Sequence, residues 1–288
     1  MKPARFSYEV PATLASALAT LAARREAAKV IAGGQSLAPM MNMRLAQPAH
    51  LVDINGLAEL EQIRLEYDRL VVGALVRHAD LARHALVREH VPMIAQAART
   101  IGHYAIRQRG TIGGSLAHAD PAAQLPLAAT ALDAMIEIAS ERGRRMVPAT
   151  EFFLSIFTTA LAPDELLVAV HIPLLAHGEG WGFRLFTRRT GDFALVSVAV
   201  TFALRNDGVI GRLRLAVGGI GSTPVRLDAA IPQNAVDARN PAWVGRVADV
   251  VAAAAEIEEN ERVSVDYRRD LLASLVRDAL ADAVESAR

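Results

Sequence analysis

The pattern of apolar and polar positions predicts helices and strands over the first 173 residues. Leucines recur at helical spacing after a proline, which predicts a helix over Pro11–Ala23. Short apolar runs predict buried strands over Lys29–Gly33 and His50–Ile54, and a hairpin over Glu61–Val76 that turns at Glu66–Asp68. The pattern then predicts a helix over Asp80–Ile101, a helix over Pro121–Leu132 with Asp120 as its N-cap, and strands over 134–139, 144–148 and 165–173.

The second half of the chain has a different organisation. Residues 174–182 are rich in glycine and predict a linker, so we expect one domain over 1–175, with subdomains of about 1–56 and 57–175, and another over 176–288. Alternation over 184–221 predicts antiparallel strands with a turn at Asn206–Gly208. The C-terminal segment Val265–Glu285 predicts an amphipathic helix that packs on this sheet. Its water-facing side chains are expected to be Arg269, Asp270, Arg277 and Asp278. The fold class is α+β.

Composition excludes several classes of function. Of the 288 residues, 52% are hydrophobic and 22% charged, so the chain can bury a sizeable core. Lys plus Arg equals Asp plus Glu, 31 each, so no bulk charge attracts nucleic acid or an anionic membrane. With 0 cysteines, the chain can supply neither thiol catalysis nor iron–sulfur ligands. The sequence shows no signal-peptide core and no apolar run near the roughly 20 residues of a membrane span, so we expect a soluble cytoplasmic protein.

Two glycine-rich stretches, "AGGQS" at 32–36 and "TIGGS" at 111–115, share a design. Each follows an apolar segment, places a hydroxyl residue after the glycines and leads into a predicted helix. Glycine permits dihedral angles that point consecutive N–H groups into one concavity, and a helix N-terminus favours phosphate. Either stretch alone fits a structural turn. The presence of both in one domain makes a cofactor with a diphosphate an equal alternative.

Other motifs are weaker. Neither stretch has the lysine of a Walker A motif or the spacing of a Rossmann fingerprint, and Gly219–Gly221 reads as a turn at a strand end. The segment Gly34–Ala38 is a relaxed hydrolase elbow around Ser36, but the last histidine, His177, lies in the linker, which disfavours a serine hydrolase. Three histidines recur every six residues and do not share a helix face, so we expect surface histidines and no metal site: His78, His84 and His90.

Three segments, "AGGQSLAPMMNMRLAQPAHLVDI", "IRQRGTIGGSLAHADPAA" and "RRTGDFALVSVAV", resemble the FAD-binding medium subunit of the molybdenum hydroxylases, the xanthine dehydrogenase and aerobic carbon monoxide dehydrogenase family. The similarity covers essentially the whole chain. It implies a two-part FAD-binding domain of the vanillyl-alcohol-oxidase type, followed by a small α+β C-terminal domain with an antiparallel sheet and packed helices.

The resemblance also implies the residues that bind the cofactor. The first diphosphate loop would be Ala32, Gly33, Gly34, Gln35 and Ser36, followed by Leu37. The second would be Thr111, Ile112, Gly113, Gly114 and Ser115. Asp120 would bind the nucleotide part of FAD, and the remaining contacts, to the flavin or as apolar neighbours, would be Ile101, Leu166, Arg184 and Phe193. Arg184 stands where xanthine dehydrogenases have a flavin-contacting lysine, and Gln35 replaces the histidine of carbon monoxide dehydrogenases.

A function follows from the resemblance. The chain would be an electron-transfer subunit without catalytic residues of its own, in a dimer of heterotrimers. A large partner would carry the molybdenum cofactor and a small partner two two-iron two-sulfur clusters, with electrons passing through FAD to an external acceptor. An N-heteroaromatic substrate is expected for the complex. The alternatives are a standalone FAD-dependent oxidase or dehydrogenase with its own substrate pocket, and a structural subunit without cofactor.

Overall fold

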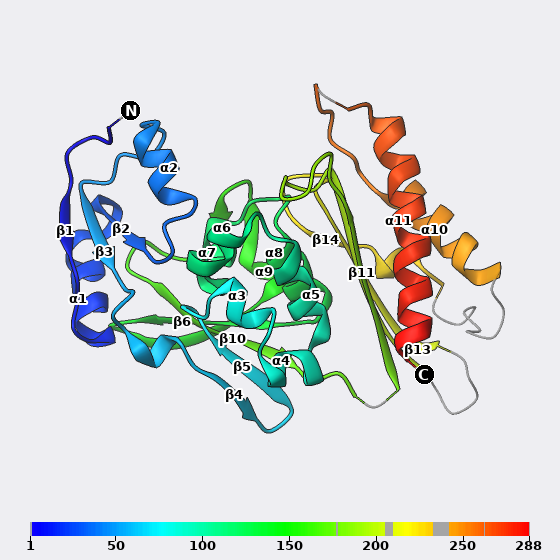
Figure 1. The fold of residues 1–288 in the computed structure, drawn as a ribbon, viewed down its shortest axis with the longest axis horizontal. Helices are drawn as coiled ribbons and strands as arrows, with labels where there is room; N and C mark the ends of the chain where they lie inside the picture. The colour runs from blue at the N-terminus through cyan, green and yellow to red at the C-terminus, as the bar shows by residue number, and fades with distance from the viewer. Residues whose placement is uncertain (1, 177, 205–209, 233–241, 262, 288) are drawn as a thin grey trace.

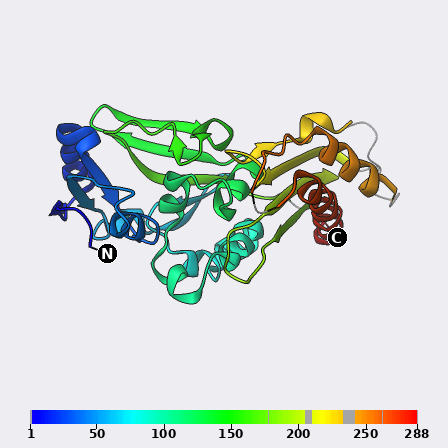
Figure 2. The same cartoon turned by 90° about the horizontal axis from the view of Figure 1, so that it is seen from above.

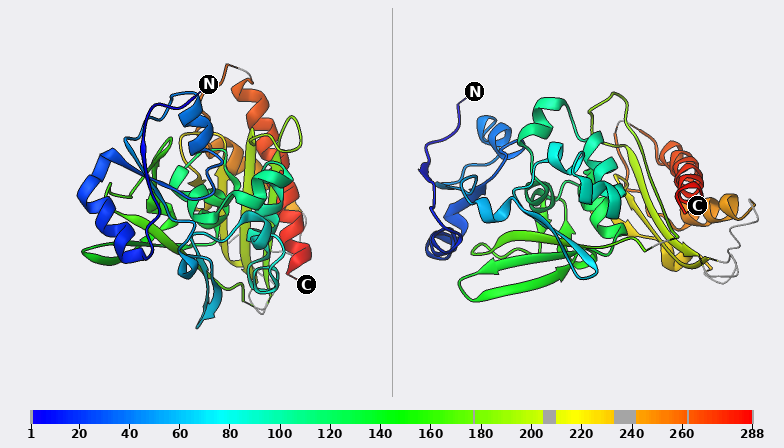
Figure 3. Two further views of the ribbon diagram at one scale, coloured as in Figure 1. Left: turned by 60° about the vertical axis from the view of Figure 1, so that its left-hand side comes forward. Right: turned by 60° about the horizontal axis from the view of Figure 1, so that its bottom comes forward.

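The computed structural model describes residues 2–176, 178–204, 210–232, 242–261 and 263–287. Three parts follow one another along the longest axis of the molecule (Figure 1). The N-terminal part lies at one end, the central part carries most of the short helices, and the C-terminal sheet and its two helices lie at the other end. The same order is visible from above and in two oblique views (Figures 2 and 3).

The N-terminal part is a parallel three-stranded sheet in the order β1–β3–β2, with one longer and one shorter helix. The helix α1 starts where Thr13 and Ser16 form a capping box, and its leucines at 14, 18 and 21 are buried, so the helix predicted here is confirmed. The elements are β1 (Ser7–Glu9), α1 (Leu14–Arg24), β2 (Ala28–Ile31), α2 (Leu37–Asn42) and β3 (His50–Asp53), with 3-10 turns at Arg25–Ala27 and Ala58–Leu60.

The central part is an antiparallel five-stranded sheet in the order β4–β5–β10–β6–β7. The predicted hairpin is confirmed, with Tyr67 at a φ of 53° in its turn. The strands expected over 134–139, 144–148 and 165–173 are also confirmed. The strands are β4 (Ile63–Glu66), β5 (Arg69–Gly73), β6 (Met135–Ser140), β7 (Gly143–Pro148) and β10 (Leu166–Pro173), with a separate pair β8 (Phe153–Ser155) and β9 (Thr158–Thr159).

Two helix predictions in the central part need correction. The single helix expected over Asp80–Ile101 is three helices, and Pro92 opens the last of them because it has no N–H to continue the one before. The helix expected from Pro121 starts later, and Asp120 is not its N-cap: its Oδ1 accepts from the N–H of Ala122 at 2.9 Å in the preceding turn. The helices are α3 (His78–Leu81), α4 (Ala85–His90), α5 (Pro92–Thr100), α6 (Tyr104–Arg109), α7 (Ile112–His118), α8 (Gln124–Ala131) and α9 (Ala149–Phe152).

The C-terminal part is an antiparallel sheet in the order β11–β12–β13–β14, with α10 and α11 on one face and the central part on the other (Figure 1). The elements are β11 (Glu179–Phe186), β12 (Val196–Leu204), β13 (Ile210–Gly218), β14 (Val225–Arg226), a 3-10 turn at Asp228–Ala230, α10 (Ala242–Ala254) and α11 (Val265–Ser286). The linker prediction was wrong for residues 179–182, because they pair with β12. The turn predicted at Asn206–Gly208 lies outside the described residues, as does His177. The domain boundaries at 56 and 175 stay predictions.

Side chains of β12 alternate between the two faces of this sheet. Val196, Val198 and Val200 pack in the core beneath α11, whereas Ala199 belongs to the core of the central part. The small side chains on the second face let α8, which is buried along its whole length, pack directly on the sheet. The central and C-terminal parts are therefore joined by a continuous apolar layer.

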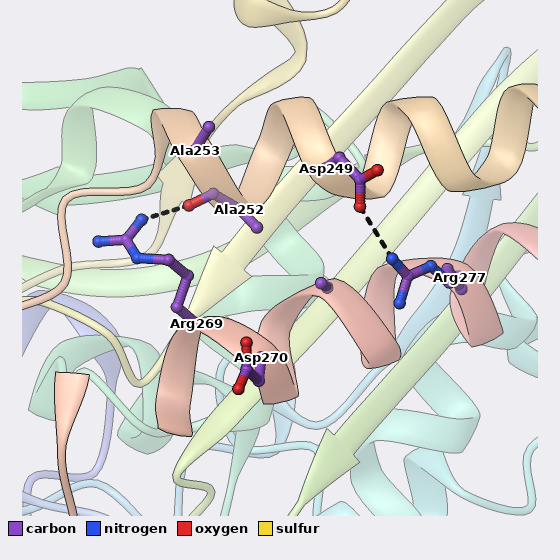
Figure 4. Close-up of a pocket in the computed structure, with 7 residues that line it drawn as sticks. Asp249, Ala252, Ala253, Arg269, Asp270 and Arg277 are labelled. Carbon is purple, nitrogen blue, oxygen red and sulfur yellow. Dashed lines mark hydrogen bonds and ion pairs between the residues drawn. The ribbon is translucent and has the colours of Figure 1, made fainter. Parts of the chain in front are cut away.

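The groove between α10 and α11 measures about 490 Å³ and lies on the outer side of the C-terminal sheet (Figure 4). Two arginines expected to face water reach across it instead. Arg277 pairs with Asp249 at 2.8 Å, and Arg269 donates to the carbonyl of Ala252 near the end of α10. The groove is thus crossed by contacts that join the two helices.

None of the helices in the described part of the chain combines the length and the apolar character that a membrane span requires.

Candidate functional site

The first glycine stretch forms the turn between β2 and α2. Gly33 is buried, Gly34 has a φ of 71°, and the Gln35 side chain donates to the carbonyl of Gly33 at 3.0 Å. Within the described part of the chain, no acceptor pairs with the backbone N–H groups of residues 33–37. Consecutive free donors at a turn that enters a helix form a concavity that suits an anion. The prediction of bared N–H groups therefore agrees with the geometry of this stretch.

The second glycine stretch is built differently, which corrects the expectation that both bare their N–H groups. Gly113 and Gly114 lie inside the first turn of α7, whose N-cap is Thr111. The N–H of Gly113 donates to the carbonyl of Ala74 at 2.9 Å, and that of Gly114 to Thr111 Oγ1 at 3.0 Å. The N–H groups of Ile112 and Ser115 also have carbonyl acceptors. This stretch offers an exposed Gly114 and a half-buried Ser115 hydroxyl rather than free amides.

Close packing is the reason for glycine at 33 and 113. A Cβ on Gly33 would lie 2.1 Å from the carbonyl oxygen of Arg109 and 2.9 Å from the Cα of Gly110. A Cβ on Gly113 would lie 2.6 Å from the Cβ of Ala74. The first contact joins the two stretches, because residues 109 and 110 lead directly into Thr111. Two segments far apart in the sequence thus form one site.

Of the remaining predicted residues, Leu166 packs beside the first stretch, and other contacts place Ile101, Phe193 and Asp120. Leu166, only 4% exposed, is in the apolar cluster against which Ala32 packs. The loop after β11 rests on the segment that follows Ile101, since a Cβ on Gly191 would lie 2.7 Å from the His103 ring. That loop carries Phe193, which is 62% exposed. The N–H of Gly219 donates to the carbonyl of Pro121 at 3.0 Å, so the end of β13 adjoins Asp120.

Arg184 is not brought to this group. The alternation of β11 directs Gly180, Gly182 and Arg184 toward α11, whereas Phe183 faces the central part. The guanidinium of Arg184 makes two hydrogen bonds of 2.6 Å to the carboxylate of Asp282, which raises its pKa. The side chain is thus held on the face of β11 that meets α11, and a contact with the flavin would require it to leave Asp282.

His78 was expected at the surface, but its side chain is buried, with 5% exposed. Its ring Nε2 lies 2.9 Å from the carbonyl oxygen of Thr111, and its backbone N–H donates to the carbonyl of Gly110 at 2.9 Å. Burial lowers the pKa of the imidazole to about 4, helped by the positive charges of Arg107 and Arg77 and opposed by the bond to Thr111. The neutral ring therefore holds the second glycine stretch in place. The sequence signal for this role was only the apolar run that precedes His78.

The pKa of His78 predicts an acid-sensitive fold. The unfolded chain binds a proton near pH 6.5 and the folded chain near pH 4, so stability is lost as pH falls through this window. A shift of this size corresponds to roughly 3 kcal/mol in the free energy of unfolding once the pH is below 4, and about 2 kcal/mol of this is lost by pH 5. Urea unfolding at pH 7.5, 6 and 5 measures it. His78→Gln keeps a donor for Thr111 and is expected to flatten the dependence, whereas an unchanged slope would contradict the assignment.

Arg77 and Asn55 are further residues that the sequence did not single out. Arg77 donates to the carbonyl of Arg109 at 2.7 Å and to Asn55 Oδ1 at 2.8 Å, and Asn55 Nδ2 donates to the carbonyl of Ala32 at 2.8 Å. These bonds link the two glycine stretches. A dinucleotide with a diphosphate fits this arrangement, because free amides, backbone surfaces without Cβ atoms and cationic side chains meet there.

Comparisons with known proteins show the family to which the chain belongs. The family described as "FAD binding domain in molybdopterin dehydrogenase" matches residues 4–175, and "CO dehydrogenase flavoprotein C-terminal domain" matches residues 181–283. The chain is 40% identical to the 6-hydroxypseudooxynicotine dehydrogenase complex subunit alpha of Paenarthrobacter nicotinovorans, over 100% of this chain and 97% of that one. It is 40% identical to the caffeine dehydrogenase subunit beta of Pseudomonas sp. (strain CBB1), over 80% and 78%.

Solved structures show the same fold over the full length. A carbon monoxide dehydrogenase from Hydrogenophaga pseudoflava superposes with a TM-score of 0.93 at 36% identity, covering 99% of both chains. A quinoline 2-oxidoreductase from Pseudomonas putida 86 gives a TM-score of 0.93 at 33% identity, covering 100% of this chain and 99% of the other. The α+β fold is thus an FAD-binding domain of the vanillyl-alcohol-oxidase type with a C-terminal domain of the carbon monoxide dehydrogenase flavoprotein type. The chain belongs to the FAD-binding medium subunits of the molybdopterin hydroxylases, the carbon monoxide dehydrogenase and xanthine dehydrogenase family, and is the flavin subunit of an oxidoreductase.

Proposed function

We propose that this chain binds FAD at the junction of the two glycine stretches and relays electrons within a heterotrimeric molybdenum hydroxylase. The electrons come from two two-iron two-sulfur clusters of a small subunit and leave to an external acceptor, and a large subunit carries the molybdenum cofactor. The observation that carries the proposal is the row of free backbone N–H groups at residues 33–37, packed against residues 109–110 of the second stretch.

The residues divide the cofactor between them. Residues 32–37 bind the diphosphate through backbone N–H groups and the hydroxyl of Ser36. Residues 111–115 form the other wall, with the open surface of Gly114 and the hydroxyl of Ser115. Asp120 binds the nucleotide portion, and Ile101, Leu166 and Phe193 supply apolar contacts to the ring. Bound FAD accepts electrons from a donor and passes them to an acceptor, while the chain orients it. Arg184 is not part of this set, because Asp282 holds it on the other face of β11.

The substrate of the complex is inferred from relatives. The two relatives at 40% identity are subunits of dehydrogenases named for 6-hydroxypseudooxynicotine and caffeine, and a structural match is named for quinoline. We therefore propose an N-heteroaromatic substrate, transformed by the large subunit, in a complex that pairs as a dimer of heterotrimers. The match to carbon monoxide dehydrogenase at 36% identity makes carbon monoxide the second substrate to assay.

The cofactor assignment is tested on the purified native chain. The protein is expected to be yellow, and heat denaturation is expected to release FAD, identified by chromatography and mass against FMN and riboflavin standards. FAD is expected because the site joins a diphosphate-binding turn to an apolar ring contact. A protein that is colourless and does not take up added FAD would contradict the assignment. Release of FMN alone would show that the diphosphate loops are assigned wrongly.

A further inference from the structure

We propose that Arg77 is a positioning residue for the cofactor. Together with Asn55 it clamps the two glycine stretches against each other and adds positive charge beside the free amides, so that the FAD diphosphate meets a preformed site. This inference rests on the proposed function. According to it, Arg77 and Asn55, which lie outside both glycine motifs, contribute to the affinity for FAD.

The clamp is a continuous chain of hydrogen bonds. Its ends are the carbonyl of Ala32 in the first stretch and the carbonyl of Arg109 just before the second. Asn55 Nδ2 donates to Ala32 O at 2.8 Å, Asn55 Oδ1 accepts from Arg77 Nη2 at 2.8 Å, and Arg77 Nη1 donates to Arg109 O at 2.7 Å. The carbonyl oxygen of Arg109 is the same atom that a Cβ on Gly33 would meet at 2.1 Å. Arg77 therefore fixes the group on which the closest approach of the two stretches depends.

The middle of the clamp is itself held rigidly. Asp53 Oδ1 accepts from both the N–H and the Nδ2 of Asn55, at 2.9 and 2.6 Å, and this orients the carboxamide with its oxygen toward Arg77. Although burial opposes ionisation, hydrogen bonds from Tyr8 and Asn55 hold the pKa of Asp53 below its usual range. The charged carboxylate is a strong acceptor, so the carboxamide does not rotate freely. A fixed Asn55 presents one acceptor to one arm of the guanidinium.

The positive charge of Arg77 is not neutralised by its partners in the clamp. Both of its hydrogen-bond acceptors are neutral, and within the described part of the chain no carboxylate lies at ion-pair distance from its guanidinium. Arg109 also has no ion-pair partner among the described residues; its charge acts on Asp53 at longer range. The guanidinium of Arg77 is bonded to the carbonyl of Arg109, the group closest to a Cβ on Gly33, so its positive charge adjoins the amides of residues 33–37. A diphosphate is the anion that matches this charge and these donors.

The arginine fork explains the choice of residue. Nη1 and Nη2 of Arg77 donate to two acceptors that belong to different segments. A lysine ammonium, at the end of a flexible stem, cannot hold both acceptors in the same fixed geometry. Lysine would keep the charge but loosen the clamp, whereas glutamine would keep a donor and lose the charge. These two variants therefore separate the two contributions.

The test measures binding of FAD and of ADP to the full-length chain after removal of bound flavin. ADP carries the diphosphate without the flavin ring. Arg77→Ala is expected to raise both dissociation constants about tenfold or more, Arg77→Gln by nearly as much, and Arg77→Lys by only about threefold. Asn55→Ala breaks the chain of bonds but keeps the charge of Arg77, so it is expected to act like Arg77→Lys. The double variant Arg77→Ala/Asn55→Ala is expected to be no worse than Arg77→Ala, since both changes break one chain of bonds.

Matched controls separate the clamp from general stability. Arg64 lies on β4 and pairs with Glu66 at 2.6 Å, so Arg64→Ala is expected to leave both dissociation constants within about twofold of native. The melting temperatures of the flavin-free Arg77 and Arg64 variants are expected to agree, and the partial rescue by lysine would not arise from a merely structural role.

The outcomes are distinct. If the native chain binds FAD and the dissociation constant of Arg77→Ala is within about twofold of the native value, the clamp is overturned and the proposed function stands. If Arg77→Ala does not fold, Arg77→Lys and Asn55→Ala decide by the same criterion. A native chain that binds neither FAD nor ADP overturns the proposed function and the clamp with it.

Discussion

A purified Gly33→Ala variant is expected to contain no FAD. The added Cβ would lie 2.1 Å from the carbonyl oxygen of Arg109, and this neighbour is backbone, which cannot turn aside as a flexible side chain would. The two glycine stretches must therefore separate, and the amides of residues 33–37 lose their position against the second stretch. We expect the FAD dissociation constant to rise by at least about 100-fold, close to 3 kcal/mol, in titrations followed by flavin fluorescence.

Two comparisons show whether this loss is local. Gly245 lies in α10, and a Cβ there would have nothing within 4 Å, so Gly245→Ala is expected to keep full flavin occupancy. A Cβ on Gly114 would meet one atom, Thr111 Oγ1 at 2.8 Å, which belongs to the side chain of the helix cap and not to the backbone. Gly114→Val is therefore expected to displace this hydroxyl, to fold, and still to lose FAD. Near-native affinity in Gly33→Ala would show that the closest approach of the two stretches does not matter for the cofactor.

The sequence predicted the first glycine stretch for a physical reason that the structure retains. A turn that must place free N–H groups at a helix entry needs glycine, and this local requirement is visible in the letters "AGGQS". The second stretch has almost the same letters, but there Gly113 permits close contact with Ala74 and the helix begins one residue before the glycines. The difference depends on what packs against the stretch, which a local pattern does not contain.

The orientations of single side chains were not predictable for a similar reason. Whether Arg184 points to α11 or to the central part depends on strand register, and a shift of one residue reverses the face. His78 is buried because residues 110 and 111 cross over it, a contact between segments more than 30 residues apart. Arg77 and Asn55 were missed because they bond to backbone carbonyls. Every residue type supplies a backbone carbonyl, so a sequence motif does not reveal such a partner. Pro92 was a local signal for the start of a new helix, but the continuous apolar pattern around it led to the prediction of a single helix.

The largest expected effect concerns electron supply. Under anaerobic conditions, the native chain alone is expected to keep its flavin oxidised in the presence of an N-heteroaromatic substrate. With 0 cysteines the chain has no ligands for an iron–sulfur cluster, and within its described residues no group of three or more His, Asp or Glu side chains could hold a metal ion. Addition of the small and large partner subunits is expected to permit rapid loss of the flavin absorbance in stopped-flow mixing.

The comparison that decides this prediction uses the same flavin in two settings. A chemical reductant such as dithionite must bleach the isolated chain, which shows that its cofactor is competent. The assembled complex should then bleach with substrate at a rate that depends on the clusters, and a small subunit prepared without clusters should block the transfer. Gly33→Ala in the complex should still allow the clusters to be reduced by substrate, because the chain acts after them. Rapid bleaching of the isolated native chain by substrate would instead favour the standalone oxidase, with a substrate pocket next to the flavin.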